Sequence, residues 1–163
     1  MNEYFPEKVR KLKESIDQRH RRDPLLKIKD KYKNMDITFK LQPVTEKQVL
    51  KVLKCMKKTK SSGVDGISTL YTKMVTKEIT PSLTKLINTS IEEGNFPEYF
   101  KMAKITPIYK NKGERDQKSS YRPISGLQTF GKVLEVVVDT QIRNYCEKYN
   151  LFGMNQHGFR KTR

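Results

Sequence analysis

Positively charged side chains gather in residues 103–125, where they could bind an anion. Two short runs of β-prone residues, 105–109 and 120–124, flank a polar loop in which Asn111 and Gly113 are turn formers. The cations of this stretch are Lys104, Lys110, Lys112, Arg115, Lys118 and Arg122. Arginine grips phosphate through two parallel hydrogen bonds, and lysine binds it as a point charge. We therefore predict a small antiparallel β-hairpin that presents these cations to a phosphate-bearing partner.

Acidic side chains, in contrast, are scattered along the chain. A polymerase or nuclease that uses two metal ions needs at least two carboxylates that converge on ions about 4 Å apart. Asp65 lies in a predicted turn, Asp116 lies in the hairpin loop, and Glu135 and Asp139 lie on a predicted helix. No Ser/His/Asp or Cys/His arrangement is recognisable either. The residues alone therefore predict no catalytic residue and no metal site in this chain.

A stretch with two glycines partly matches the sequence of a nucleotide-binding loop. Residues 126–132 fit the first seven positions of the phosphate-binding sequence GxxxxGK, but Val133 stands where a serine or threonine should hold magnesium. Leu127 and Phe130 also continue the apolar stripe of the helix predicted to follow. We therefore interpret this stretch as the start of a helix and exclude an ATP-binding loop.

The cysteines and histidines do not have the spacing of a zinc site. Cys55 and Cys146 are far apart, and neither pairs with His20 or His157 in a short Cys-x-x-Cys or His-x-x-x-His motif. Each cysteine falls inside an apolar helical pattern. We expect both to be buried free thiols.

The net charge of the chain points to a polyanionic partner. Among 163 residues, 34 are Lys or Arg and 18 are Asp or Glu, which gives a formal net charge of +16. Nucleic acid is the expected polyanion, and a membrane surface is the alternative. No segment approaches the roughly 20 apolar residues of a spanning helix, and the N-terminus lacks the apolar core of a signal peptide. We expect no membrane association and an intracellular location, with nucleus and cytoplasm both open.

Much of the chain outside the hairpin has apolar residues at helical spacing, so we expect helices to position the hairpin. This spacing predicts helices over about 6–18, 45–57, 70–79, 81–93 and 126–149. Thr45 and Gln48 form a capping-box pattern, Thr80 is the expected N-cap of the helix that opens with Pro81, and Gly94 is its expected end. The fold class predicted is α+β and helix-dominated.

Two further features divide the chain into regions. A proline in each predicted strand, Pro107 and Pro123, confines both strands to a sheet edge. Residues 1–40 are dense in charge and read as a basic arm or linker, with a solvated tail as the alternative. Residues 41–163 hold the predicted domain.

Five sequence blocks then resemble the opening blocks of non-LTR (LINE-type) retrotransposon reverse transcriptases. They are Lys-Ser-Ser-Gly-Val-Asp-Gly-Ile at 60–67, Ala-Lys-Ile-Thr-Pro-Ile-Tyr-Lys-Asn-Lys-Gly at 103–113, Tyr-Arg-Pro-Ile-Ser at 121–125, Gly-Lys-Val-Leu-Glu at 131–135 and Gln-His-Gly-Phe-Arg at 156–160. The resemblance covers about residues 45–163. It implies the fingers and the edge of the palm of a right-handed polymerase, with the hairpin folding over the incoming nucleotide.

The resemblance also implies roles for individual cations. Arg122 and Lys110 would contact the triphosphate of a deoxynucleoside triphosphate. The residues implied to face an RNA/DNA template-primer are Lys60, Lys104, Lys112 and Arg160.

Family members continue beyond the Gly-Phe-Arg block into strands that carry the metal-binding aspartates, whereas this chain ends at Arg163. We therefore expect a reverse-transcriptase fingers fragment that stops before the catalytic palm. It would need the missing palm and thumb as partners, and it would be inactive alone, because Mg²⁺ is implied only for the complete polymerase. The alternative is a repurposed basic module that binds nucleic acid or protein without binding nucleotide.

Overall fold

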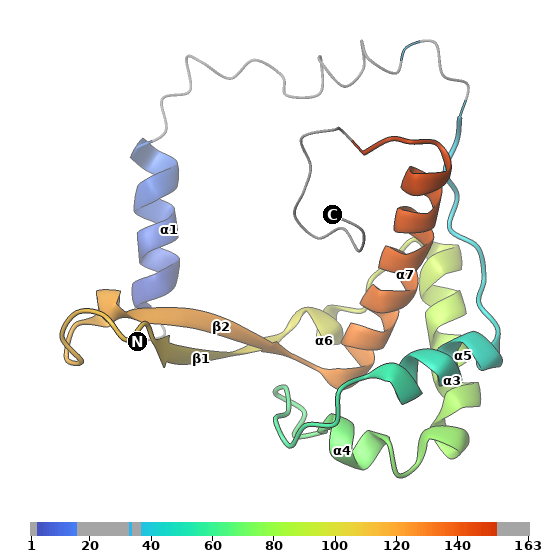
Figure 1. Ribbon diagram of the computed structural model, residues 1–163, viewed down its shortest axis with the longest axis horizontal. Helices are drawn as coiled ribbons and strands as arrows, with labels where there is room; N and C mark the ends of the chain where they lie inside the picture. The colour runs from blue at the N-terminus through green and yellow to red at the C-terminus, as the bar shows by residue number, and fades with distance from the viewer. Residues whose placement is uncertain (1–2, 16–32, 34–36, 153–163) are drawn as a thin grey trace. The chain divides into compact units, whose positions relative to one another are not determined.

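The computed structural model describes residues 3–15, 33 and 37–152. They fall into two compact units. The hairpin unit comprises Met1–Thr38 with Ile105–Ser125, and the helical unit comprises Phe39–Lys104 with Gly126–Arg163. The elements in chain order are α1 (Tyr4–Ser15), α3 (Glu46–Cys55), α4 (Thr69–Thr72), α5 (Thr76–Glu93), α6 (Glu98–Lys101), β1 (Ala103–Tyr109), the short 3-10 helix η2 (Lys118–Ser120), β2 (Tyr121–Leu127) and α7 (Thr129–Lys148) (Figure 1).

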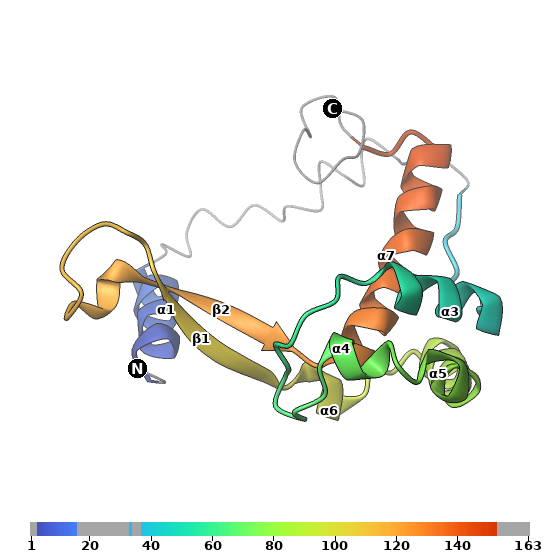
Figure 2. The ribbon, with the colours of Figure 1, turned by 60° about the horizontal axis from the view of Figure 1, so that its bottom comes forward.

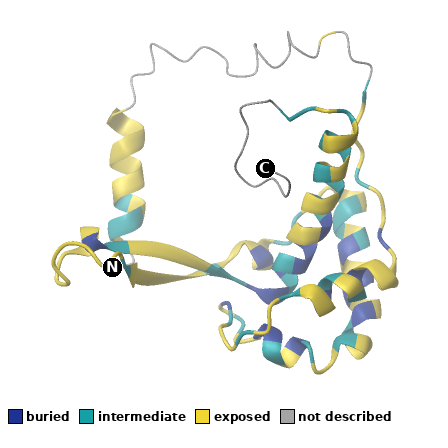
Figure 3. Ribbon diagram, viewed as in Figure 1, coloured by how far each residue is buried: buried dark blue, intermediate teal, exposed yellow. Residues whose placement is uncertain are grey.

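The helical unit is built on α3, α5 and α7, and α3 packs against both of the others (Figure 2). Each helix contributes apolar side chains at helical spacing to one buried cluster. Figure 3 marks the buried residues in dark blue. The cluster consists of Val44, Val49, Leu53, Leu83, Ile87, Phe100, Val133, Leu134 and Val137. These elements confirm the predicted helix-dominated α+β fold.

The start of α3 confirms the predicted capping box. The Gln48 backbone N–H donates to Thr45 Oγ1 at 3.4 Å, and the Thr45 backbone N–H donates to Gln48 Oε1 at 2.8 Å. The helix ends at Cys55, two residues before the predicted end, because Met56 has extended backbone angles. The prediction that Cys55 is buried was wrong. The buried stripe of α3 follows Val49 and Leu53, and Cys55 lies off that stripe and is exposed, while Cys146 is half-buried.

The region around Pro81 differs from the prediction. Instead of a helix over 70–79 and a new helix after Thr80, the chain forms the short α4 and then α5, which runs through Pro81. The hydroxyl of Thr80 is buried and donates to the Thr76 carbonyl one turn earlier, so Thr80 is an interior helical residue and not an N-cap. The predicted end at Gly94 is confirmed, because Gly94 adopts a left-handed φ of 64°.

β1 and β2 form a two-stranded sheet in the described part of the chain, so both strands lie at an edge, as their prolines predicted. Both strands are longer than predicted. Because β2 includes Gly126 and Leu127, α7 begins at Thr129, three residues after the predicted start. Gly126 is therefore in a strand and Gly131 is in a helix, where a side chain would approach Phe100 Cβ to 3.2 Å. No open phosphate loop forms over 126–132, but the interpretation of the whole stretch as helix was only partly right, because its first two residues belong to β2.

An extended segment before α3 is fastened to the helical unit by two side-chain amides. Asn88 Oδ1 accepts from the Val44 backbone N–H at 2.8 Å, and Asn88 Nδ2 donates to the Val44 carbonyl at 3.0 Å. Gln141 makes the same pair of bonds with the backbone of Gln42, each at 2.8 Å. Each amide thus replaces the partner strand that an extended backbone would otherwise need.

Candidate functional site

The predicted cationic hairpin forms, and its register can be read from two contacts. The Lys110 backbone N–H donates to the Ser120 carbonyl at 2.8 Å, and the rings of Tyr109 and Tyr121 lie 5.6 Å apart. This register brings Arg122 opposite Ile108. Because side chains alternate along a strand, Arg122 lies on the face of the ribbon opposite to that of Tyr121.

The loop between the strands is shaped by its own hydrogen bonds. The hydroxyl of Tyr109 donates to the Gly113 carbonyl, and the hydroxyl of Tyr121 donates to the Arg115 carbonyl at 2.8 Å. Asn111 and Gly113 have positive φ angles of 57° and 83°, which confirms their predicted role as turn formers. The two tyrosines at the ends of the strands therefore hold the loop from both sides.

Three loop cations are oriented by neighbouring groups. Lys110 Nζ donates to the Ser119 carbonyl at 2.7 Å. The guanidinium of Arg115 lies 5.3 Å from the centre of the Tyr109 ring, within the range of a cation–π interaction. Lys118 Nζ lies 6.0 Å from the centre of the Tyr4 ring, at the limit of that range. Each of these cations is held near the loop.

Arg122 differs from these three loop cations. Its side chain is exposed and, within the described residues, makes no ion pair with Glu114 or Asp116, the acidic residues nearest to it in the loop. Its neighbours on the same face, Ile108 and Ile124, are 50% and 46% exposed. The N–H donors of the guanidinium are therefore open to an external anion.

The other predicted binding residues are distributed between the units. Lys112 is exposed in the hairpin loop, so Lys110, Lys112 and Arg122 all belong to the hairpin unit. Lys60 and Lys104 are exposed and belong to the helical unit. The predicted residue Arg160 lies outside the described residues.

Lys60 opens a loop with a well-defined backbone. Asp65 Oδ1 accepts from the Ile67 backbone N–H at 3.1 Å, and Gly66 has a positive φ of 71°. Gly63 packs so closely on Gln128 that a side chain would come within 2.9 Å of its backbone. These contacts set the course of residues 60–67 and leave Lys60 at the surface.

Neither metal ligation nor a membrane span is found in the described ranges. Over residues 3–15, 33 and 37–152, no three His, Cys, Asp or Glu side chains form a group that could hold a metal ion. The Asp65 carboxylate is used in its turn, and the Asp139 carboxylate accepts from Arg143 Nε at 2.6 Å. These described residues thus do not fit a Mg²⁺ site. Within the same ranges, no helix is both long and apolar enough to cross a bilayer.

Two features of the site were not anticipated from the sequence. One is the role of Tyr109 and Tyr121 in holding the loop, and the other is the approach of Tyr4, in α1, to Lys118. A tyrosine near the end of each predicted strand could have indicated the first, because such residues face each other in a hairpin. Nothing in the local sequence pairs Tyr4 with residues more than 100 positions away.

Comparison with known proteins identifies several relatives, although no family model matches the chain. A putative 115 kDa protein in the type-1 retrotransposable element R1DM of Drosophila melanogaster is 32% identical over 66% of this chain and 10% of its own length. A probable RNA-directed DNA polymerase from transposon BS is 24% identical over 78% of this chain and 14% of its own length, and that of mobile element jockey is 24% identical over 76% and 14%; both are from the same fly. The chain thus spans about one seventh or less of these relatives.

Proposed function

We propose that this chain, which is similar to a segment of non-LTR (LINE-type) retrotransposon reverse transcriptases, supplies the fingers part of an RNA-directed DNA polymerase. In this proposal Arg122 and Lys110 bind the triphosphate of the incoming deoxynucleoside triphosphate. The exposed cations proposed to bind the RNA/DNA template-primer are Lys60, Lys104 and Lys112, and Arg160 is proposed for the same role from the sequence.

The exposure of Arg122 is the observation that carries the proposal. A guanidinium already paired with a carboxylate would have to lose that partner before it could bind phosphate, and Arg122 has no such partner among the described residues. Pro123 after it favours an extended backbone at Arg122, so the side chain projects from a defined strand. Its planar fork can bind two phosphate oxygens at once.

The contribution proposed for these residues is positional and electrostatic. Phosphoryl transfer is catalysed mainly by alignment of the reacting groups and by stabilisation of the charge on the phosphate oxygens. Arg122 and Lys110 would hold the triphosphate and offset part of its charge. Since the described residues do not fit a Mg²⁺ site, we assign no chemical step to them.

Titration of the isotope-labelled chain with thymidine triphosphate, followed by NMR, tests this proposal. Arg122→Ala should weaken binding about tenfold or more, because a hydrogen-bonded pair of charges is worth about 1.5–3 kcal/mol. Arg122→Lys keeps the charge and removes the fork, so it should lose most of the same affinity. Lys118→Ala is the matched control, since it removes one exposed hairpin cation that is already directed toward Tyr4.

The same titration separates the proposal from its rival. A basic module that only attracts polyanions should lose a similar, modest affinity in all three variants, and it should bind inorganic tripolyphosphate and the nucleotide equally. Such a result would contradict the assignment of Arg122. A selective loss in the two Arg122 variants, with Lys118→Ala near the parent value, is the result that we expect.

A further inference from the structure

The hairpin needs support from outside its own two strands. The central residues of β1 and β2 are exposed, and an isolated two-stranded ribbon is at best marginally stable in water. The loop hydrogen bonds of Tyr109 and Tyr121 act only at one end of the ribbon. A further element of the hairpin unit must therefore contribute if the strands are to hold Arg122 in a defined position.

α1 lies beside the ribbon. A cleft of about 520 Å³ is lined by residues of α1 and of both strands. The lining residues on α1 are Phe5, Pro6, Val9, Arg10 and Lys13, and those on the strands are Ile105, Pro123 and Ser125. Five of these eight side chains are apolar, so closing the cleft would remove apolar surface from water.

The first turn of α1 also lies near the hairpin loop, at the limit of a cation–π interaction. The Tyr4 ring lies 6.0 Å from Lys118 Nζ and 5.2 Å from the Phe5 ring, which it meets edge to face. Tyr4 and Phe5 therefore lie beside different parts of the hairpin unit, the loop cation and the strand cleft.

Packing against the ribbon would also stabilise α1. A helix of 12 residues is marginal by itself, and its own ion pairs are exposed. Arg10 donates to Glu7 and to Glu14, and its hydrogen bonds lower the pKa of the Glu7 carboxyl. Such exposed pairs add little stability. Helix and ribbon are thus two weak elements that can stabilise each other.

The alternation of side chains along β2 identifies the face of the ribbon beside which α1 lies. Pro123 and Ser125 of β2 line the cleft, so Arg122 and Ile124 lie on the other face. We propose that α1 is an intramolecular brace on the back of the hairpin, which holds the ribbon in shape and leaves the Arg122 face open. This inference concerns the order of the ribbon and holds whether or not the hairpin binds nucleotide.

Hydrogen exchange on the full chain provides the first test. Val9→Asp places a charge in the cleft and should speed amide exchange in residues 105–125 by about fivefold, the factor that corresponds to about 1 kcal/mol. The helical unit should keep its exchange rates. Val9→Leu, which keeps an apolar side chain in the cleft, should leave exchange in the hairpin as slow as in the parent chain.

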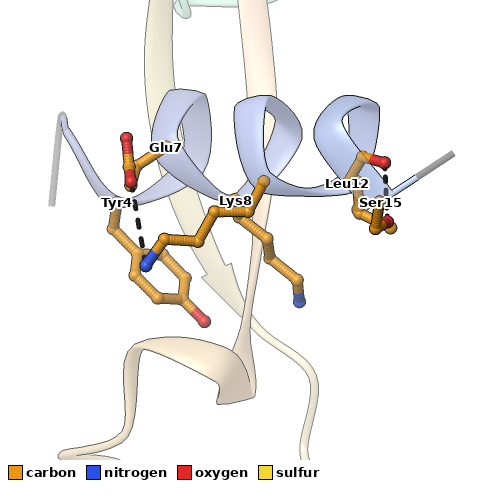
Figure 4. Close-up of a pocket in the computed structure, with 6 residues that line it drawn as sticks. Tyr4, Glu7, Lys8, Leu12 and Ser15 are labelled. Carbon is orange, nitrogen blue, oxygen red and sulfur yellow. Dashed lines mark hydrogen bonds and ion pairs between the residues drawn. The ribbon is translucent and has the colours of Figure 1, made fainter.

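Leu12→Asp is the matched control. Val9 is 53% exposed and Leu12 is 55% exposed, so exposure alone predicts equal effects. Leu12, however, lines a groove formed only by residues of α1, with Tyr4, Lys8 and Ser15 along it (Figure 4). Leu12→Asp should leave the exchange of the hairpin unchanged. Equal effects of the two aspartates, or no effect of either, would overturn the brace.

Cross-linking provides a second test that does not depend on a destabilised variant. In a chain with Cys55→Ser and Cys146→Ser, a short bis-maleimide should join Val9→Cys to Ser125→Cys within one molecule. Leu12→Cys with Ser125→Cys should react several times more slowly. Equal rates for the two pairs would contradict the brace. A mixture of two chains, one with Val9→Cys alone and the other with Ser125→Cys alone, is the control, and cross-linking in that mixture as fast as in the double variant would also contradict the brace.

Discussion

At the scale of single residues, the hairpin loop depends on a glycine that no other residue can replace without strain. Gly113 has a φ of 83°, and a Cβ at this position would lie 2.6 Å from Ser120 Oγ. Ser120 is itself buried, so it cannot move away freely. The loop that carries Lys110 and Lys112 is thus set by a conformation and a close approach at the same position.

Gly113→Ala should disorder the loop. The left-handed conformation alone costs an alanine about 1–2 kcal/mol, and the clash with Ser120 adds to it. NMR contacts between the Tyr109 and Tyr121 rings should weaken or disappear. Adding Ser120→Ala should recover part of the loss, because it removes the clash but not the strain.

Gly66→Ala is the comparison for this prediction. Gly66 also has a positive φ, of 71°, but nothing lies within 4 Å of its missing Cβ. It should therefore show the cost of strain without a clash. A Gly113→Ala chain that keeps the contacts between the tyrosine rings would show that the loop tolerates both.

Asn88→Ala should destabilise the helical unit by about 2 kcal/mol, since it leaves a half-buried N–H and C=O of Val44 without partners. Denaturant unfolding measures this change. Asn144→Ala, an exposed substitution on α7, should stay within about 0.5 kcal/mol of the parent. Similar losses in the two variants would show that the amide of Asn88 is not a special anchor.

At the scale of elements, the helices share a buried core and the hairpin has none of its own. α3, α5 and α7 bury a shared apolar cluster, whereas the ribbon exposes the middle of both strands. The helical unit should therefore unfold as one cooperative body, while the hairpin opens locally at lower free energy. This difference suits an element that must adapt to a ligand.

Pro81→Ala should stabilise α5 and with it the helical unit. Proline in a helix interior is about 3 kcal/mol less favourable than alanine. Proline also stiffens the unfolded chain, and the loss of this effect reduces the gain in stability by up to about 1 kcal/mol. Pro81 is exposed, so the change disturbs no packing. The expected gain of about 2 kcal/mol is measured by denaturant unfolding.

The neighbouring substitution Ser82→Ala is a control for this prediction. Ser82 is also exposed on α5, but it already donates a backbone N–H to the helix, so its replacement should change stability by only a few tenths of a kcal/mol. If Pro81→Ala brings no gain, α5 does not run through this position in solution.

At the scale of the whole molecule, the excess of positive charge defines the expected partner. With a net charge of +16, the chain should attract single-stranded nucleic acid with little sequence preference. If about five phosphates are neutralised, log K should fall with log salt with a slope near −3.5. Fluorescence anisotropy with a labelled RNA measures the slope.

The contribution of the residues proposed to face the template-primer can be isolated. Combined replacement of Lys60, Lys104 and Lys112 by alanine should reduce the magnitude of the slope by about 2, from roughly 0.7 per phosphate contact. Binding that is insensitive to salt, or a slope that the triple variant does not change, would place the nucleic-acid contacts elsewhere in the chain or remove them altogether.

The isolated chain should not extend a primer on an RNA template with Mg²⁺ or Mn²⁺. Stabilisation of the phosphoryl-transfer transition state requires bound ions, and the described carboxylates of Asp65 and Asp139 serve a turn and an ion pair. The complete jockey RNA-directed DNA polymerase is a suitable positive control. Extension by the chain above a reaction without protein would refute this prediction.

Local chemistry made much of this protein predictable from the sequence. The capping box of α3, the left-handed Gly94, the turn residues Asn111 and Gly113 and the edge strands all follow from constraints that act within a few residues. The cations of the hairpin could be found for the same reason. Their side chains are exposed, so a local pattern of charge survives folding unchanged.

Tertiary packing decided the rest. Pro81 stays inside α5 because Leu83 and Ile87, which follow it in the helix, are buried in the core cluster, and this burial outweighs one missing hydrogen bond. Cys55 is exposed because α3 turns a different stripe toward α5 and α7. The cleft between α1 and the hairpin strands brings together residues about 90–120 positions apart. Local propensity carries no information about such contacts, because their free energy comes from surfaces that meet only when the chain has folded.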